Sequence, residues 1–214
     1  MTAARDEVLA RVRRALADVP AGESPGDVPV PRDYRRREAT SARELVEQLA
    51  DRLRDYGAGV QSVAGPDVAA AVGRACAARG SRRVAVPADL PEAWLPPGLD
   101  VVVDGGLTAE RLDDCDAVVS GCGLAIAQTG TLVLDGGPAQ GRRLLSLIPD
   151  HHVCVVRADQ VVGLVPEAIS ALAESARQGR PITFVSGPSA TSDIELRRVQ
   201  GVHGPRRLDV LIVG

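Results

Sequence analysis

From about residue 40 onward, the sequence alternates helical patterns with short, valine-rich strands. Helices are expected at 41–57, 66–78, 141–147 and 159–178, with a short one starting near Ser192. Strands are expected at 59–63, 82–87, 100–105, 151–156, 182–187 and 208–214. This alternation is typical of a mainly parallel sheet with helices on both faces. We therefore predict an α/β fold with a mainly parallel sheet.

The segment from Asp116 to Gly136 departs from this alternation. It joins three apolar β segments through breaks of small residues at 121–123 and 128–131. These breaks are too short for crossover helices, so at least one pair of these strands must be antiparallel or bent. We predict an added antiparallel β element beside the parallel sheet.

The residues ahead of this body have a different character. Residues 1–18 are predicted to form an amphipathic helix, with Val8, Val12 and Leu16 at helical spacing. Residues 19–39 are rich in proline and arginine and lack periodicity, as an extended linker does. The expected organisation is therefore 1–18, 19–39 and a domain at 40–214. A helix on such a linker usually packs on its own domain or on a neighbouring subunit, which leaves a homo-oligomer open.

Composition excludes several classes of chemistry. All the positive charge is arginine, so neither a lysine Schiff base nor a Walker lysine is available. Aromatic residues make up 2% of the chain and the formal net charge is -3. Without a stacking platform or a basic excess, we expect no nucleic-acid partner.

The cysteines and the apolar runs indicate an intracellular protein. Four scattered cysteines, Cys76, Cys115, Cys122 and Cys154, show no CxxC pair, so we interpret them as reduced thiols and expect no metal site. No segment approaches about 18 uninterrupted apolar residues, and the first residues lack an apolar signal segment. We expect a cytoplasmic protein with no membrane partner.

The first candidate site follows one of the apolar β segments. Thr129 and Thr131 flank Gly130, and two hydroxyls around a glycine could present donors to an anion. A β-hairpin turn explains the same residues and is the preferred interpretation of this stretch taken alone.

The second candidate lies between Gly187 and Glu195. The chain passes Gly187 and Ser189 and is expected to enter a helix around Ser192, whose free N–H groups would suit a carboxylate or phosphate. Ser192 and Glu195 also have the spacing of a capping box, and Asp193 favours a first helical turn, so capping alone explains the acidic residues. Alternatively, Asp193 or Glu195 serves as a base beside the anion.

The third candidate is His203, which is held between glycines and followed by Gly204-Pro205. Such a histidine could act as acid, base or ligand near neutral pH, although a lone histidine in a turn is more often solvated. His151 and His152 are adjacent on a predicted strand, so their side chains should leave opposite faces and could not easily share a metal.

Three segments together, "AIAQTGTLVL", "SGPSATSDIE" and "GVHGPRRLDVLIV", resemble the LUD domain of lactate-utilisation protein C. The resemblance implies a fold similar to the superfamily of ribose-phosphate isomerase, glucosamine-phosphate deaminase and CoA-transferase, which is a Rossmann-like α/β sheet with an added β element. It also implies a role in oxidising L-lactate to pyruvate with partner proteins that carry iron–sulfur clusters. No cofactor is expected in this chain, because it lacks cluster ligands and a dinucleotide fingerprint.

The resemblance also assigns site residues. The expected anion-binding set is Thr129, Gly130, Thr131, Gly187, Ser189, Thr191, Ser192 and Gly204, and the expected catalytic set is His203, Glu195 and Asp193. Many relatives have glutamate where this chain has Gln128, and an amide cannot accept a proton as a carboxylate does.

Three functions stay open at this point. The leading one is a non-cluster subunit of an L-lactate oxidation system that holds a small carboxylate. The second is an independent enzyme for a phosphorylated or CoA-linked small metabolite. The third is a scaffold or regulatory module whose N-terminal helix docks on a partner.

Overall fold

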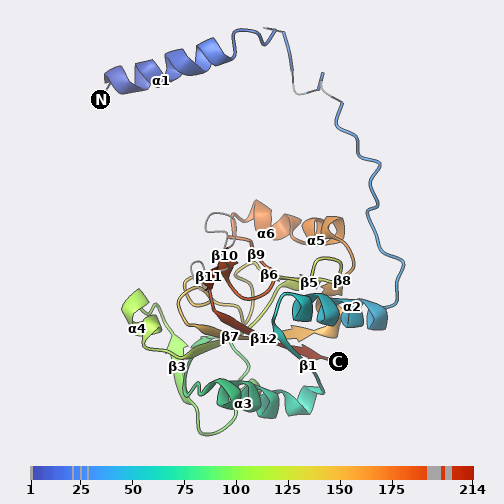
Figure 1. Ribbon diagram of the computed structural model, residues 1–214, viewed down its shortest axis with the longest axis vertical. Helices are drawn as coiled ribbons and strands as arrows, with labels where there is room; N and C mark the ends of the chain where they lie inside the picture. The colour runs from blue at the N-terminus through green and yellow to red at the C-terminus, as the bar shows by residue number, and fades with distance from the viewer. Residues whose placement is uncertain (1, 21, 25, 28, 192–198, 201–203) are drawn as a thin grey trace. The chain divides into compact units, whose positions relative to one another are not determined.

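The computed structural model describes residues 2–20, 22–24, 26–27, 29–191, 199–200 and 204–214 (Figure 1). The chain divides into two compact units, Met1–Tyr34 and Arg35–Gly214. Helix α1, Thr2–Ala15, belongs to the first unit, and its Val8 and Val12 are largely exposed.

A six-stranded parallel sheet is the centre of the second unit. Its strands run in the order β1-β12-β7-β4-β2-β3. Their bounds are β1 Gly59–Val63, β2 Arg83–Pro87, β3 Asp100–Asp104, β4 Ala117–Gly121, β7 His151–Arg157 and β12 Arg207–Val213. The mainly parallel α/β sheet predicted from the alternating pattern is confirmed.

A second, four-stranded sheet lies against one face of the parallel sheet. Its order is β8-β5-β6-β9, with bounds β8 Val161–Val162, β5 Leu124–Ile126, β6 Thr131–Leu134 and β9 Thr183–Val185. The β5–β6 and β6–β9 pairs are antiparallel. This confirms the antiparallel element predicted from the short breaks between the apolar segments.

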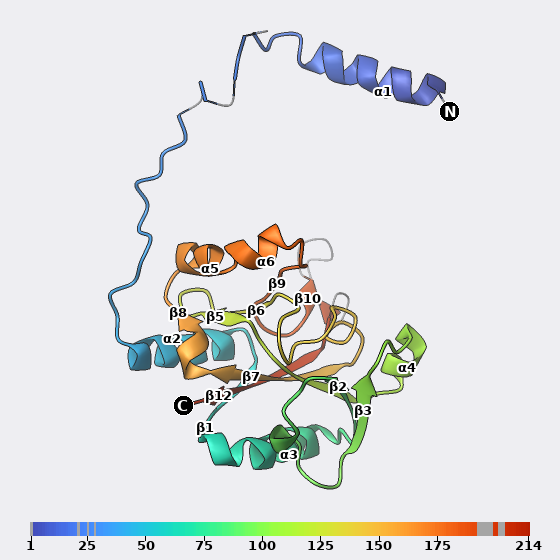
Figure 2. The same ribbon diagram turned by 180° about the vertical axis from the view of Figure 1, so that it is seen from behind.

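Helices complete the layers (Figures 1 and 2). Helix α3, Val68–Arg79, follows the 3-10 turn Gly65–Asp67 and packs Val72 and Cys76 on one face of the parallel sheet. Helix α2, Ala42–Asp55, packs Leu49 and Leu53 on the opposite face, together with the second sheet. The α2 helix begins with the predicted capping box, because Ser41 and Glu44 bond each other's backbone N–H groups.

Short elements fill the connections. They are the 3-10 turns Glu92–Trp94 and Ala158–Gln160, with helices α4 Ala109–Asp113, α5 Val165–Ala171 and α6 Ala173–Arg177. Ala168 and Leu172 of the α5–α6 segment cover the outer face of the second sheet, against Leu124 and Val133.

Two predicted helices are wrong. Residues 141–147 form turns, and Gly141, at φ +68, has a backbone conformation that does not continue a helix. The predicted helix at 159–178 is divided into a 3-10 turn, β8, α5 and α6. Gly163 lies at this break, where a Cβ would come 2.3 Å from the Cβ of Glu38.

The helix predicted near Ser192 lies outside the described residues. On either side of it, β10 Ala190–Thr191 pairs antiparallel with β11 Val199–Gln200.

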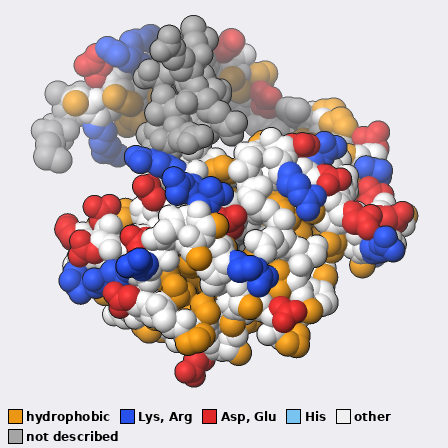
Figure 3. Space-filling model, turned by 60° about the horizontal axis from the view of Figure 1, so that its bottom comes forward, with side chains coloured by type: hydrophobic (Ala, Val, Ile, Leu, Met, Phe, Trp, Pro, Cys, Tyr) orange, Lys and Arg blue, Asp and Glu red, His pale blue; other side chains and the backbone are white. Residues whose placement is uncertain are grey.

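No helix in the described part of the chain combines the length and apolar character needed to cross a membrane. Figure 3 shows one face of the molecule, where basic and acidic side chains are interspersed among hydrophobic ones. The described side chains of this face form no continuous basic patch.

Candidate functional site

The loop that contains Gly187 and Pro188 contacts the loop that contains Gly204 and Pro205. The backbone N–H of Ser189 donates to the carbonyl oxygen of Pro205 at 2.8 Å. A cavity of about 240 Å³ lies against them, which we call the head cavity. It is lined by Gly187, Ser189 and Gly204, and also by Ser186, Arg143, Ser146 and His152.

The head cavity lies near the amino ends of two central strands. Gly204 and Pro205 precede β12, which begins at Arg207, and His152 is the second residue of β7. Gly187 follows β9 of the second sheet. Gly187 therefore belongs to a loop of the second sheet, whereas Gly204 and Pro205 belong to a loop that leads into the parallel sheet.

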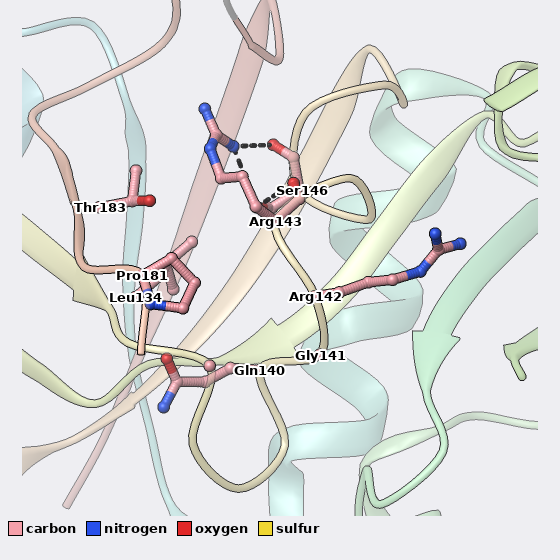
Figure 4. Close-up of a pocket in the computed structure, with 9 residues that line it drawn as sticks. Leu134, Gln140, Gly141, Arg142, Arg143, Ser146, Pro181 and Thr183 are labelled. Carbon is pink, nitrogen blue, oxygen red and sulfur yellow. Dashed lines mark hydrogen bonds between the residues drawn. The ribbon is translucent and has the colours of Figure 1, made fainter. Parts of the chain in front are cut away.

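Arg143 provides a positive charge at this cavity. Its Nη1 donates to the carbonyl oxygen of Ser146 at 3.2 Å and to Ser146 Oγ at 3.1 Å, which holds the side chain in place (Figure 4). Burial lowers the pKa of the guanidinium from its ordinary value. The group nevertheless stays protonated at neutral pH and has five N–H donors in a planar fork that suits carboxylate or phosphate.

His152 adds an imidazole whose tautomer follows from its hydrogen bonds. Its Nε2 lies 2.7 Å from Ser120 Oγ, and the Ser120 hydroxyl donates to the carbonyl oxygen of Gly121 at 2.9 Å. Because a hydroxyl has a single hydrogen, Ser120 Oγ must accept from the N–H at Nε2. In the neutral ring, Nδ1 is then the nitrogen that can accept a proton.

Two buried thiols lie behind His152 on the same face of the parallel sheet, Cys154 of β7 and Cys122, which follows β4. The hydrogen bond from Cys122 is the main cause that lowers the pKa of Cys154, and His152 and Ser120 contribute while burial opposes them. The same contact and burial raise the pKa of Cys122. Within this pair, Cys154 is therefore the thiol that ionises first.

A chain of hydroxyl groups connects the Thr129–Thr131 turn to the head cavity. Thr129 Oγ1 and Thr131 Oγ1 are 2.7 Å apart, and Thr131 Oγ1 is 2.8 Å from Ser186 Oγ. The turn itself is the β5–β6 hairpin connection. A Cβ at Gly130, whose φ is +59, would come 2.6 Å from the Cβ of Arg52. This turn therefore supports the cavity wall and gives α2 room to approach.

The glycine at position 187, like Gly130, leaves room for α2. Its φ is +92, and a Cβ there would come 2.6 Å from the Cβ of Tyr56, at the end of α2. The close packing of the loop on α2 therefore requires glycine at this position.

A second cavity of about 300 Å³ adjoins the first, which we call the side cavity (Figure 4). Arg143, Ser146 and Thr183 line both cavities. The side cavity is otherwise lined by Leu134, Gly136, Gln140, Gly141, Arg142 and Pro181.

The structure brings together part of the predicted site. Gly187, Ser189 and Gly204 line the head cavity, whereas Thr129, Gly130 and Thr131 lie in the neighbouring hairpin. The backbone of Thr191 lies in β10. Ser192, Asp193, Glu195 and His203 lie outside the described residues.

Sequence reasoning missed Arg143, Ser146 and His152. The first two were assigned to a helix that does not form, and His152 was considered only as a metal ligand. The pair Arg142-Arg143 in a glycine-bounded segment was the available signal. Among the described residues, no group of three or more His, Cys, Asp or Glu side chains is arranged to hold a metal ion.

The fold and the cavity define an α/β protein with an arginine at a polar cavity, where β7 of a parallel sheet approaches β9 of a smaller one. A family model described as the LUD domain matches residues 37–213. This chain belongs to the LUD domain family.

Its relatives are named for lactate utilization. The chain is 48% identical over 213 residues to lactate utilization protein C of Deinococcus radiodurans, which covers 99% of this chain and 96% of that protein. It is 31% identical over 114 residues to lactate utilization protein C of Halalkalibacterium halodurans, covering 51% and 49% of the two chains. The crystal structure of a DUF162 family protein from Deinococcus radiodurans is similar with a TM-score of 0.72 and 45% identity, covering 82% of this chain and 99% of that one.

Proposed function

We propose that this chain is the non-cluster component of a cytoplasmic system that oxidises L-lactate to pyruvate, and that its head cavity holds the carboxylate of the 2-hydroxy acid. The family membership and the names of the relatives support a part in lactate utilization. The observation that favours a carboxylate is the position of Arg143, which is anchored by Ser146 and lines both cavities.

The proposed chemistry uses two groups of the cavity. Arg143 pairs with the substrate carboxylate in a charge-assisted contact. His152 accepts the hydroxyl proton at Nδ1, with its tautomer held by Ser120. His203, Glu195 and Asp193 remain alternative proton acceptors.

Oxidation also removes two electrons and the hydrogen on the hydroxyl-bearing carbon. We assign the acceptor of this hydrogen and of the two electrons to the partner proteins, whose iron–sulfur clusters would carry the electrons away, since the sequence offers no cluster-ligand spacing or dinucleotide fingerprint.

The glutamine at position 128 fits this assignment. Gln128 is exposed, its backbone N–H donates to the carbonyl oxygen of Gly163 at 3.1 Å, and it does not line either cavity among the described residues. A missing carboxylate at this position therefore leaves the proposed proton acceptor unchanged.

The test is lactate-dependent dye reduction by the chain co-expressed with the proteins encoded beside its gene. Arg143→Gln should reduce kcat/KM for L-lactate by roughly 100-fold, because an uncharged amide cannot replace the ion pair. Arg177→Gln, which alters an exposed arginine of α6 paired with Glu174, is the matched control. Equal activity of Arg143→Gln and the unmodified complex would refute the proposed site. Activity of the isolated chain on a phosphorylated or CoA-linked metabolite would favour the independent enzyme instead.

A docking role for the N-terminal unit is a second candidate. It is favoured by the exposed stripe of α1, formed by Val8 and Val12 and continued by Leu16. Deletion of residues 1–37 should abolish co-purification with the partner proteins while the family domain stays folded. Unchanged co-purification would exclude this role.

A further inference from the structure

The side cavity lies next to the head cavity on the side of Arg143. The same three residues, Arg143, Ser146 and Thr183, line both the head cavity and the side cavity, so the two spaces adjoin at the proposed carboxylate site. In Figure 4, Thr183 and Pro181 lie on one side of the side cavity and the Arg143–Ser146 pair on another. A ligand whose carboxylate lies at Arg143 therefore has room for a further group beside it.

The charged and amide side chains around the side cavity bond within the protein. Gln140 Nε2 donates to Asp135 Oδ1 at 2.8 Å, and its Oε1 accepts from the backbone N–H of Asp135 at 2.8 Å. Arg142 turns away from Pro181 and Thr183 and binds Asp104 with both Nε and Nη2, at 2.8 and 2.9 Å (Figure 4).

The rest of the side-cavity wall, apart from these polar groups, is largely apolar. This part of the wall consists of Leu134, Pro181, Thr183 and the backbone of two glycines. Such a surface favours an aliphatic group over a second charge.

The volumes exceed what L-lactate needs. Lactate consists of a carboxylate, a hydroxyl-bearing carbon and a methyl group, which at roughly 30 Å³ for each water-sized group occupy on the order of 100 Å³. The head cavity alone provides about 240 Å³ and the side cavity about 300 Å³. A ligand as small as lactate would leave the side cavity empty.

We propose that the natural substrates include 2-hydroxy acids with aliphatic side chains longer than methyl, with the side chain in the side cavity. This inference rests on the proposed function, since it assumes that Arg143 holds a carboxylate. Each methylene buried on binding should improve affinity roughly 4-fold. L-2-hydroxyisocaproate, which has three more carbons than L-lactate, should therefore bind on the order of 50-fold more tightly.

The experiment is calorimetric titration of the full chain with L-lactate and with L-2-hydroxyisocaproate, expressed as the ratio of their dissociation constants. Pro181→Trp places an indole at the side cavity from an exposed position and should reduce the ratio from about 50 to near 1. Ile169→Phe, an enlargement at an exposed position of α5 that does not line either cavity, is the matched control and should leave the ratio unchanged. Leu134→Phe gives a second way to fill the side cavity if the tryptophan variant fails to fold.

The outcomes separate this inference from the proposed function. Equal affinity for the two acids, or a ratio that neither Pro181→Trp nor Leu134→Phe changes, would overturn the inference that the substrate has a side chain longer than methyl. Neither result would contradict the carboxylate site. If Arg143→Gln binds both acids as well as the unmodified chain does, the carboxylate site itself is wrong and the inference falls with it. A large ratio that the filling variants abolish, with both acids weakened by Arg143→Gln, would support both.

Discussion

Asp209 has a buried carboxylate whose removal should destabilise the central sheet measurably. It lies on β12, is 8% exposed, and accepts from His151 Nε2 at 2.8 Å, while Ser81 Oγ lies 3.0 Å from His151 Nδ1. Because a carboxylate only accepts, Nε2 must be the donor, and in the neutral ring Nδ1 accepts from the Ser81 hydroxyl. The three side chains thus form one directed chain of hydrogen bonds.

The magnitude follows from these contacts. A hydrogen bond to a charged acceptor contributes roughly 1.5–3 kcal/mol, and a partly exposed ion pair such as Arg79–Asp209, at 3.5 Å, adds roughly 0–1 kcal/mol. Asn keeps the size of the side chain and one neutral hydrogen bond, so Asp209→Asn should reduce the free energy of unfolding by about 2 kcal/mol at pH 7.

The loss should also depend on pH. Burial raises the pKa of Asp209, but the hydrogen bond and charge of His151, together with Arg79, outweigh it and leave the pKa below its ordinary value. A carboxyl whose folded-state pKa is lowered stabilises the fold fully above its unfolded pKa of about 3.9, and this contribution disappears as pH falls through the folded-state value. The difference between Asp209→Asn and the unmodified protein should therefore narrow below about pH 4.

Urea unfolding followed by the fluorescence of Trp94, the single tryptophan, measures both effects. Asp159→Asn is the control, because its ion pair with Arg157 is exposed and should change stability by roughly 0.5 kcal/mol or less. Equal stability of Asp209→Asn and the unmodified protein at pH 7, or a difference that persists unchanged at pH 3, would refute the reasoning.

Three further substitutions test the local packing by thermal or urea unfolding. Gly187→Ala should lower the free energy of unfolding by about 3 kcal/mol, because backbone strain at φ +92 adds to the clash with Tyr56. Gly57→Ala, at φ +87 in open space, should show the strain alone, which is roughly 1–2 kcal/mol. Equal losses of stability in the two variants would contradict the clash. Ser41→Ala should cost about 1 kcal/mol through loss of the capping box, and no change would mean that water replaces the cap. Thr131→Val should cost about 1 kcal/mol by interrupting the hydroxyl chain to Ser186, which a neutral result would exclude as a stabilising element.

Local signals predicted most of the fold. The capping box at Ser41 predicted where α2 begins, and the short breaks in 116–136 predicted an antiparallel pair. The helix wrongly predicted at 159–178 shows that local signals do not predict structure that depends on distant residues. A side chain at Gly163 would collide with Glu38, more than a hundred residues earlier, and periodicity within the segment has no information about that neighbour.

The site was less predictable for the same reason. The imidazole of His152 is oriented by Ser120 from another strand, and Thr131 bonds Ser186 across 55 residues. The loops with glycine and proline were visible because their residue types are unusual. The arginine that gives the cavity its charge was not recognised, because Arg143 lies in a segment that was predicted to be a helix.

The position of β12 has a consequence for how the chain folds during synthesis. In the parallel sheet β12 lies between β1 and β7, and Gly59 of β1 is opposite Asp209. On the ribosome, β1 and the helix before it must therefore wait for about 150 further residues before their neighbouring strand exists. Gly204 and Pro205, which complete the head cavity, emerge just ahead of that strand. The cavity should thus form only when β12 inserts, and a nascent chain stalled before residue 207 should present an open sheet edge to chaperones.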